Sequence, residues 1–391
     1  MRKSLVWGGV LALGLAGTGA WAAPDKPGPA AEAKASLTKD AINAAAFPAP
    51  AGDRGGKDDA EKANGGRREG GKREIGKNES GKNESDKRDR AEADGAKKST
   101  EIDPLIVKAQ VLLDRARFSP GAVDGRSGEN FVGALRAFAG AQGLTASDDL
   151  DRAVFEKLQA TSADPVAMDY TITDEDVKGP FTPIPAKMEE QADLDAMAYT
   201  TPREMLAERF HMQRDLLSAL NPDKPFDKAG TVITVAAVPP LGTGKVKGPP
   251  QDPRVARIEV DKDARRVQAF GEDGKLVATY PASIGSEEKP APSGSFKVQG
   301  VAFDPWYTYD PKYRFKGVKS RKKFSIHPGP NNPVGVVWID LSIPSYGIHG
   351  TPEPEKVGKT ESHGCIRLTN WDARDLALHT KRGAKVDFVE R

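Results

Sequence analysis

The only cysteine of this 391-residue chain, Cys365, lies in the run Ser-His-Gly-Cys-Ile-Arg-Leu at residues 362–368. A histidine, His349, lies upstream in the run Tyr-Gly-Ile-His-Gly-Thr at residues 346–351. A lone thiol cannot form a disulfide within the chain, so its value lies in packing or in reactivity. A thiol with a pKa of ~8.5 is mostly protonated at neutral pH, and a nearby histidine can take its proton to form a thiolate–imidazolium pair. The pattern therefore predicts a cysteine nucleophile.

Two histidines are candidates for the base. His363 comes two residues before Cys365, but closeness along the chain does not by itself give good geometry for proton transfer. His349 belongs to a separate strand end, and the following Gly350 permits a close approach of backbone to the sulfur. We favour His349 as the base, with His363 shaping the pocket or polarising the acyl carbonyl.

The residues around the cysteine have supporting roles in this hypothesis. Gly364 indicates a tight turn that aims backbone N–H groups at a developing oxyanion. Arg367 suits a carboxylate in bidentate fashion, or a salt bridge that supports the turn. Ser362 forms local hydrogen bonds. A zinc site is the alternative for His349, His363 and Cys365, but the spacing fits no usual pattern and a fourth ligand is not evident. We expect neither a metal nor a cofactor.

The elements that must position these residues are mainly strands. Beyond residue 254 the hydrophobic period is two, which predicts strands around residues 258–260, 267–269 and 277–279. Further strands are predicted at residues 296–301, 334–341 and 385–389. One helix is predicted near residues 371–380, with Asn370 as its N-cap. Residues 254–391 are therefore predicted to form a mostly-β domain.

The paired motifs, together with Pro-Ala-Pro-Ser-Gly-Ser-Phe at 290–296 and Asn-Pro-Val-Gly at 332–335, resemble the bacterial L,D-transpeptidase catalytic domain. The resemblance implies a β-sandwich with one helix near the C-terminus. It also implies that Cys365 is the nucleophile and His349 the proton donor and acceptor. Some members have Ser after the base histidine, so Gly350 implies that a backbone carbonyl orients the imidazole here.

The same resemblance implies a reaction on peptidoglycan stem peptides. Cys365 attacks the carbonyl on the L-centre of a diamino acid in a tetrapeptide stem, the terminal D-alanine leaves, and an amine of a second stem resolves the thioester. It also implies acylation by carbapenems. Water as acceptor would make the enzyme an L,D-carboxypeptidase, and an envelope lipoprotein lysine would make it a transferase to that partner. A non-catalytic wall-binding protein is disfavoured because the His349/Cys365 pair is intact.

Two modules are predicted upstream. Residues 101–162 have a helical period, and the turn Val123-Asp124-Gly125 resembles that of the small α-helical peptidoglycan-binding domain, with a purely structural turn as the alternative. Residues 168–238 resemble a small α+β LysM module, which implies contact with glycan strands, although its opening strand is unclear. His211 is interpreted as a packing or surface residue. Residues 239–253 form a Pro/Gly linker.

The N-terminal part has the pattern of an exported protein. Arg2 and Lys3 precede an apolar core, and Ala20-Trp21-Ala22 offers a cleavage site, so residues 1–23 are predicted to be a signal peptide. Residues 24–100 are rich in charged residues, Gly and Ala, which predicts a disordered tether. We therefore expect a multidomain protein of the periplasm or cell envelope.

The overall charge narrows the partners. The chain has 58 basic and 56 acidic residues, and the predicted signal peptide carries two of the basic ones and no acidic one. A balanced mature chain does not favour a polyanion such as nucleic acid. No stretch after the signal peptide is apolar enough to span a membrane. We expect a monomer whose partners are stem peptides and glycan strands.

Overall fold

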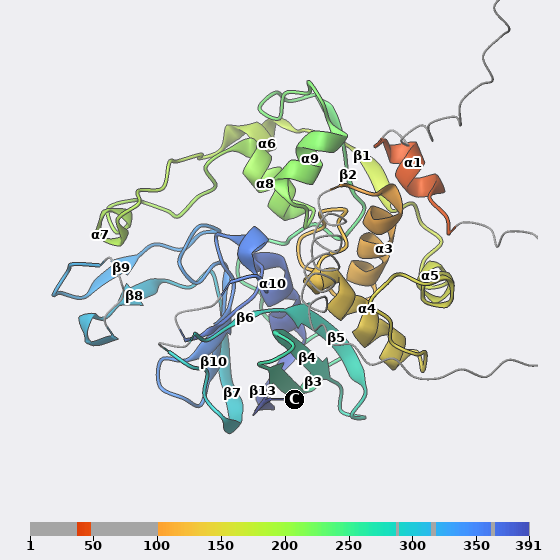
Figure 1. Ribbon diagram of the computed structural model, residues 1–391. Helices are drawn as coiled ribbons and strands as arrows, with labels where there is room; N and C mark the ends of the chain where they lie inside the picture. The colour runs from red at the N-terminus through yellow and green to blue at the C-terminus, as the bar shows by residue number, and fades with distance from the viewer. Residues whose placement is uncertain (1–36, 48–100, 287–288, 314–317, 361–363, 391) are drawn as a thin grey trace, which may run out of the picture. The chain divides into compact units, whose positions relative to one another are not determined.

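The computed structural model describes residues 37–47, 101–286, 289–313, 318–360 and 364–390 (Figure 1). The predicted signal peptide and most of the predicted tether lie outside these ranges. The described residues belong to one compact unit by their internal contacts. None of the helices in the described ranges is long and apolar enough to cross a membrane.

The prediction of a disordered tether is wrong for residues 37–47. Helix α1 (Lys39–Ala44) begins at Thr38, whose side chain accepts a hydrogen bond from the Ala41 N–H. Ile42 is fully buried, and Asn43 donates to the Ala167 carbonyl at 2.9 Å. The averaged composition of a long polar stretch concealed a short segment whose few apolar residues bury themselves against the next part of the chain.

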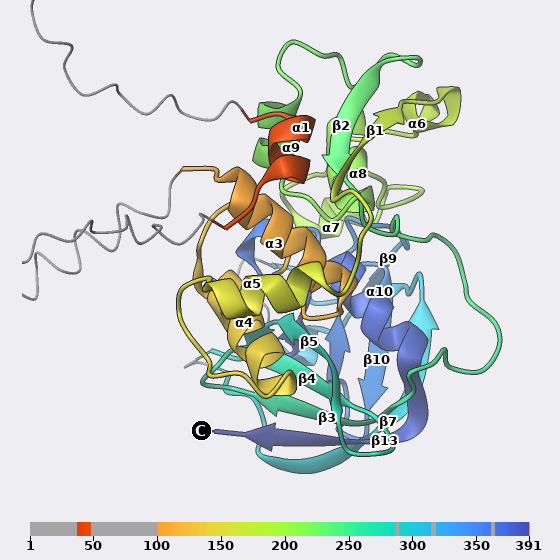
Figure 2. The same ribbon diagram turned by 90° about the vertical axis from the view of Figure 1, so that its right-hand side faces the viewer.

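Three helices follow, as the period predicted: α3 (Pro104–Arg115), α4 (Glu129–Ala141) and α5 (Arg152–Gln159). The turn between α3 and α4 is held by Gln110, whose side-chain oxygen accepts from the N–H groups of Asp124 and Gly125 at 3.0 and 2.8 Å. Gly125 has a φ of +71°, a conformation that favours glycine. The helix α4 packs against β5 of the next domain (Figure 2).

The second upstream segment begins and ends with a strand, and its helices lie between the two strands. Strands β1 (Ala167–Thr171) and β2 (Val232–Ala236) pair antiparallel, and helices α8 (Pro202–Arg209) and α9 (Arg214–Leu220) lie between them in the chain. Strand β1 is the opening strand that the sequence left unclear. Two short helices, α6 (Asp174–Lys178) and α7 (Met188–Gln191), precede α8. Both upstream segments contribute to one hydrophobic cluster, so they share a core.

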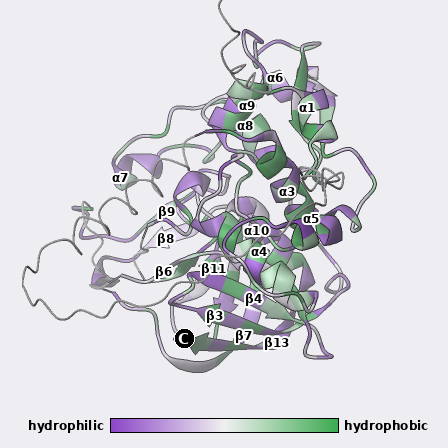
Figure 3. Cartoon of the chain, turned by 45° about the vertical axis from the view of Figure 1, so that its right-hand side comes forward, coloured by the Kyte–Doolittle hydropathy of each residue, from purple (hydrophilic) through white to green (hydrophobic). Residues whose placement is uncertain are grey.

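The C-terminal domain is built on nine strands in the order β5-β4-β3-β13-β7-β10-β11-β12-β6. The resemblance implied a β-sandwich. Instead β7 pairs with β13 along residues 294–297 and with β10 along residues 298–303, which joins the two halves into one sheet. Hydrophobic and hydrophilic residues mix along these strands (Figure 3), in keeping with one buried face. The strands are β3 (Val255–Asp261), β4 (Arg266–Phe270), β5 (Leu276–Pro281), β6 (Ser283–Ile284), β7 (Gly294–Phe303), β10 (Val337–Leu341), β11 (Gly347–His349), β12 (Ile366–Arg367) and β13 (Thr380–Val389).

Two further elements complete this domain. Strands β8 (Tyr307–Tyr309) and β9 (Phe324–Ile326) form a separate antiparallel pair. Helix α10 (Asn370–His379) packs against β10 and β11. Its N-cap is Thr369 rather than the predicted Asn370, because the Thr369 hydroxyl accepts from the Asp372 N–H at 3.0 Å. The Asn370 side chain is therefore available to form hydrogen bonds with other segments.

Buried polar contacts connect the C-terminal domain to the upstream helices. Arg117 donates to Asp375 of α10 at 3.0 Å and to the Tyr280 hydroxyl at 3.1 Å. Arg266, which is 5% exposed, donates to the backbone carbonyls of Ser119 and Asn130 at 2.9 and 3.1 Å. Charged groups buried in this way need partners on both sides of the contact, so the upstream region and the C-terminal domain are adapted to each other.

Candidate active site

The two sequence motifs meet on neighbouring strands. Strands β11 and β12 pair in parallel, with Ile348 beside Ile366 and His349 beside Arg367. Cys365 immediately precedes β12, so its backbone lies beside β11 near Gly347. The Cys365 Sγ lies 4.0 Å from the Ser345 carbonyl oxygen. The fold thus brings the predicted nucleophile and the predicted base onto adjacent strand ends.

His349 is 5% exposed, and its ring is fixed from two sides. Its Nδ1 donates to the Gly350 carbonyl at 2.6 Å, which is the type of backbone contact that the glycine implied. Nε2 then carries the lone pair. The ring stacks on Trp338 at 5.6 Å between centroids. Burial lowers the pKa of His349 to about 4, assisted by Arg367 and opposed by the Gly350 carbonyl.

Burial favours the protonated form of the Cys365 thiol. Burial raises the pKa of Cys365 above its ordinary value of 9.0, while the Gly347 N–H, Arg367 and Lys289 act in the opposite direction. Both pKa shifts favour the neutral imidazole and the protonated sulfur over the thiolate–imidazolium pair expected from the sequence. The reason is that both groups lie in a partly desolvated site, which disfavours two charges.

Arg367 places a positive charge beside both groups. Its Nε is buried and has no hydrogen-bond partner within the described ranges. Burial lowers the pKa of this guanidinium, whereas Glu353 and Cys365 raise it. Because no side-chain ion pair holds it among the residues described here, the Arg367 guanidinium can donate hydrogen bonds to a carboxylate.

Three aromatic side chains lie near this site: Tyr346, Tyr307 and Trp338. No role was assigned to any of them from the sequence. The Tyr346 hydroxyl donates to the Gly364 carbonyl. Because C=O and N–H point in opposite directions across a trans peptide, this contact turns the Cys365 N–H away from Tyr346. Burial and the neighbouring Cys365 raise the pKa of Tyr307 to about 12. Tyr346 is the first residue of the motif at residues 346–351, whereas Tyr307 lies on β8 and Trp338 on β10.

The remaining predicted residues stand as follows. Gly364 has a φ of +124°, so its backbone conformation requires glycine, in keeping with the predicted tight turn. Gly350 contacts Asn370 so closely that an added Cβ would lie 2.1 Å from the Asn370 Oδ1. Ser362 and His363 lie outside the described residues.

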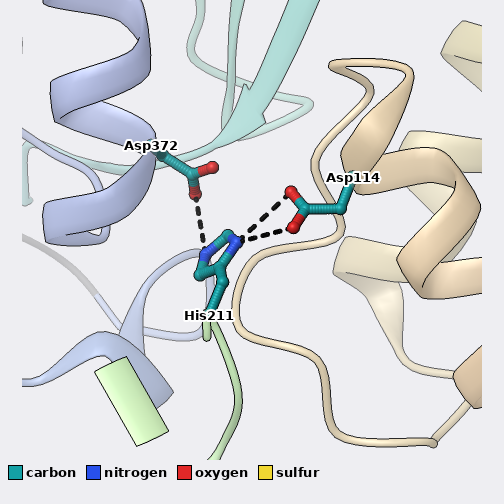
Figure 4. A group of neighbouring side chains, drawn as sticks. All are labelled: Asp114, His211 and Asp372. Carbon is teal, nitrogen blue, oxygen red and sulfur yellow. Dashed lines mark hydrogen bonds and ion pairs between the residues drawn. The ribbon is translucent and has the colours of Figure 1, made fainter. Parts of the chain in front are cut away.

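One group of side chains with metal-ligand chemistry occurs among the described residues: Asp114, His211 and Asp372. His211 Nδ1 lies 3.1 Å from Asp114, and Nε2 lies 3.8 Å from Asp372. Figure 4 shows the two carboxylates on opposite sides of the ring. A metal ion binds one ring nitrogen along its lone pair, so these carboxylates do not converge on a shared ion.

The arrangement fits an imidazolium between two carboxylates instead. Burial alone would lower the pKa of His211, but Asp114 and Asp372 outweigh it and raise the pKa to about 9. The ring also stacks on Trp371 at 4.7 Å between centroids. His211 is therefore a buried, charged residue that connects three segments, which goes beyond the packing or surface residue that we predicted.

Known proteins resemble the C-terminal domain. The model of the YkuD family, described as the L,D-transpeptidase catalytic domain, matches residues 255–388. The putative L,D-transpeptidase YkuD of Bacillus licheniformis is 32% identical over 34% of this chain and 65% of its own length. YqjB of Bacillus subtilis, also named a putative L,D-transpeptidase, is 30% identical over 39% of this chain and 79% of its own.

A third relative is more similar in sequence. A putative L,D-transpeptidase of Fuscovulum blasticum is 51% identical over 34% of this chain and 68% of its own length. The chain thus spans 65% of the Bacillus licheniformis relative and somewhat more of the other two. On the strength of these matches and the paired motifs, the chain belongs to the L,D-transpeptidase family.

Proposed function

We propose that this protein is an L,D-transpeptidase that forms peptidoglycan cross-links, with Cys365 as nucleophile and His349 as base. The parallel pairing of β11 and β12 carries this proposal, because it sets the two motifs on neighbouring strands. Family membership supports the substrate class, a peptidoglycan stem peptide. The depressed pKa of His349 supports its role, because the imidazole is neutral and able to accept a proton at neutral pH.

In the first half-reaction, the Cys365 sulfur attacks the carbonyl carbon on the L-centre of the diamino acid while its proton moves to His349 Nε2. A tetrahedral oxyanion forms. The C–N bond to D-alanine then breaks, and the imidazolium gives its proton to the departing amine. The products of this half are free D-alanine and an acyl-thioester on Cys365.

Proton transfer accompanies the attack rather than preceding it. Burial raises the pKa of Cys365 and lowers that of His349, so a proton transfer that preceded the attack would be unfavourable. The bond that forms between sulfur and carbon offsets this cost if both events share one transition state. Arg367 assists by stabilising negative charge near the sulfur.

In the second half-reaction, the amine of a second stem attacks the thioester carbonyl. His349 takes a proton from this amine and returns a proton to the sulfur as the C–S bond breaks. The product is an amide between two stems, and the enzyme regains its thiol and neutral imidazole. The Cys365 N–H, directed away from Tyr346, is the backbone donor that we assign to the oxyanion in both halves.

Mass spectrometry of products from defined tetrapeptide muropeptides tests this function. With an acceptor stem present, we expect a dimer and one D-alanine per cross-link from the wild type, and neither from Cys365→Ala. A tripeptide with no dimer would assign a carboxypeptidase, and retention of D-alanine release by Cys365→Ala would refute the nucleophile. Circular dichroism of the variant checks that the fold is intact.

The regions outside the catalytic domain have proposed roles of their own. The helical segment 101–162 and the LysM-like segment 168–238 are assigned to glycan strands, and residues 1–23 to export into the cell envelope. The antiparallel pairing of β1 with β2, with α8 and α9 between them in the chain, supports the assignment of the second segment. Cosedimentation of the full chain with purified peptidoglycan sacculi checks it, with Cys365→Ala used to prevent turnover.

A further inference from the structure

A carboxyl group of the upstream region contacts the catalytic domain behind its active site. Glu208 lies in the last turn of α8, and its Oε1 accepts from Asn370 Nδ2 at 2.9 Å and from the Tyr199 hydroxyl at 3.0 Å. Desolvation raises the pKa of Glu208 to about 7, opposed by these two hydrogen bonds. Whether or not the carboxyl is protonated, Oε1 remains an acceptor for Asn370.

Asn370 is the residue that Glu208 fixes. It is fully buried at the start of α10, and its side-chain amide makes three hydrogen bonds with other segments. Nδ2 also donates to the Pro330 carbonyl at 3.0 Å, and Oδ1 accepts from the Val336 N–H at 3.1 Å. With both ends of the amide bonded, the side chain has one orientation, and Glu208 supplies one of the bonds that choose it.

The oriented amide presses on the glycine that follows the base. An added Cβ on Gly350 would lie 2.1 Å from the Asn370 Oδ1, and one on Gly335 would lie 1.9 Å from the same atom. Only glycine backbone fits there, so the position of Asn370 determines where the Gly350 peptide lies. That peptide carries the carbonyl that accepts from His349 Nδ1 at 2.6 Å.

A second contact holds the same two helix ends together. His211, three residues after Glu208, lies between Asp114 and Asp372 (Figure 4). Its Nε2 also lies 3.2 Å from the Thr369 hydroxyl. Thr369 and Asp372 flank Asn370 on α10. The end of α8 is therefore anchored on both sides of the Glu208–Asn370 hydrogen bond.

We propose that Glu208 is a positioning residue for the base of the reaction, acting through Asn370 and the Gly350 carbonyl on His349. By this inference, the upstream region does more than bring substrate, because it contributes one hydrogen bond that selects the Nδ1–H form of the imidazole. Nε2 is then left to exchange protons with Cys365. This role rests on the proposed function of His349 as base.

The test compares Glu208→Ala with Glu208→Gln in the full chain. Gln keeps the acceptor oxygen for Asn370, whereas Ala removes it. Nitrogen-15 NMR of histidine-labelled protein reports which ring nitrogen carries the proton, and the His349→Gln spectrum assigns the His349 signals. We expect the Nδ1–H form in the wild type and in Glu208→Gln, and a mixture of both forms in Glu208→Ala. We also expect kcat to fall about tenfold to a hundredfold in Glu208→Ala, with KM little changed.

Asp176→Ala is the matched control for loss of stability. Asp176 is buried in the same upstream segment and pairs with Arg209, next to Glu208, but has no contact with α10 among the interactions described. This variant should lower the thermal midpoint while keeping the Nδ1–H form and the kcat of the folded enzyme. A single wild-type tautomer and unchanged kcat in Glu208→Ala would overturn the proposal, as would equal effects of Asp176→Ala or of Glu208→Gln. Failure of the proposed function is distinguishable, because the tautomer is read without turnover.

Discussion

His349 and Arg367 are register partners in the parallel strands β11 and β12, so a guanidinium lies beside the imidazole that we assign as the base. This pairing explains why a histidine next to a cysteine stays neutral. Burial disfavours its charged form, and a fixed positive neighbour disfavours it further. The same guanidinium attracts a thiolate, so Arg367 favours the charged form of Cys365 and disfavours the charged form of His349.

The first prediction concerns the pH dependence of transfer. Because the pKa of His349 is lowered to about 4 and the base must be neutral, kcat/KM should stay high from neutral pH down to pH 5 and fall as pH decreases through about 4. The thiol should gain alkylation rate as pH rises beyond 9. The rate of iodoacetamide modification, measured from neutral pH to beyond pH 9, checks the prediction for the thiol. A modification rate that has already reached its plateau at neutral pH would instead indicate a preformed thiolate–imidazolium pair.

Replacing Arg367 should raise the pH at which activity is lost on acidification. Arg367 lowers the pKa of His349, so Arg367→Gln should shift the loss of activity from about 4 toward the ordinary histidine value of 6.5. The same change should slow alkylation of Cys365 near neutral pH, because the sulfur loses a favourable charge. The control is Arg257→Gln, which removes an arginine paired with Glu259 on β3. A shift in this control equal to that of Arg367→Gln would contradict a local effect.

Adding one methyl group behind the base should also be costly. In Gly350→Ala the new Cβ would lie 2.1 Å from the Asn370 Oδ1, so the backbone or Asn370 must move. We expect a loss of about 1–3 kcal/mol in the free energy of unfolding, and a lower kcat because the carbonyl that holds His349 is displaced. Gly300→Ala on β7 is the control, since nothing lies within 4 Å of its added Cβ. Chemical denaturation and steady-state kinetics check both variants.

The ion pairs of His211 with Asp114 and Asp372 predict that the stability of the fold changes at alkaline pH. Its pKa is raised from 6.5 to about 9, so protonated His211 stabilises the fold fully below pH 6.5, and this stabilisation is lost as pH rises through about 9. His211→Gln leaves Asp114 and Asp372 without their cation, and we expect a loss of about 3–5 kcal/mol at neutral pH. Urea denaturation at pH 7 and pH 10 measures the difference from wild type, which should shrink at pH 10. In the control His327→Gln, this pH trend should be absent.

The motif pair and the alternating strands allowed the catalytic domain and its two central residues to be predicted from sequence. The N-cap of α10 was misplaced by one residue, because Thr369 and Asn370 are both good caps and only the tertiary contact of Asn370 decides between them. The role of His211 could not be read from its place between α8 and α9 in the chain. Its carboxylate partners come from two distant segments, and nothing in the local pattern links them.

Helix α1 and strand β1 were missed for a related reason. Each is short, and each owes its stability to burial against other elements rather than to local preference. Tyr307 and Trp338 lie near the site because β7, β8 and β10 are arranged around it, which is a property of the topology. Local patterns therefore give the chemistry of this site, while the surroundings that set its pKa values depend on the whole fold.

The buried charges that join the two halves of this chain limit how its parts can be recombined. Arg266 and Asp372 are each less than 6% exposed and are matched to groups upstream of residue 212. In a chimaera that joins residues 254–391 to a foreign N-terminal segment, these buried charges would lose their partners. Although the family model matches residues 255–388 alone, the catalytic domain of this protein cannot be exchanged by itself, because its upstream partner has to accompany it.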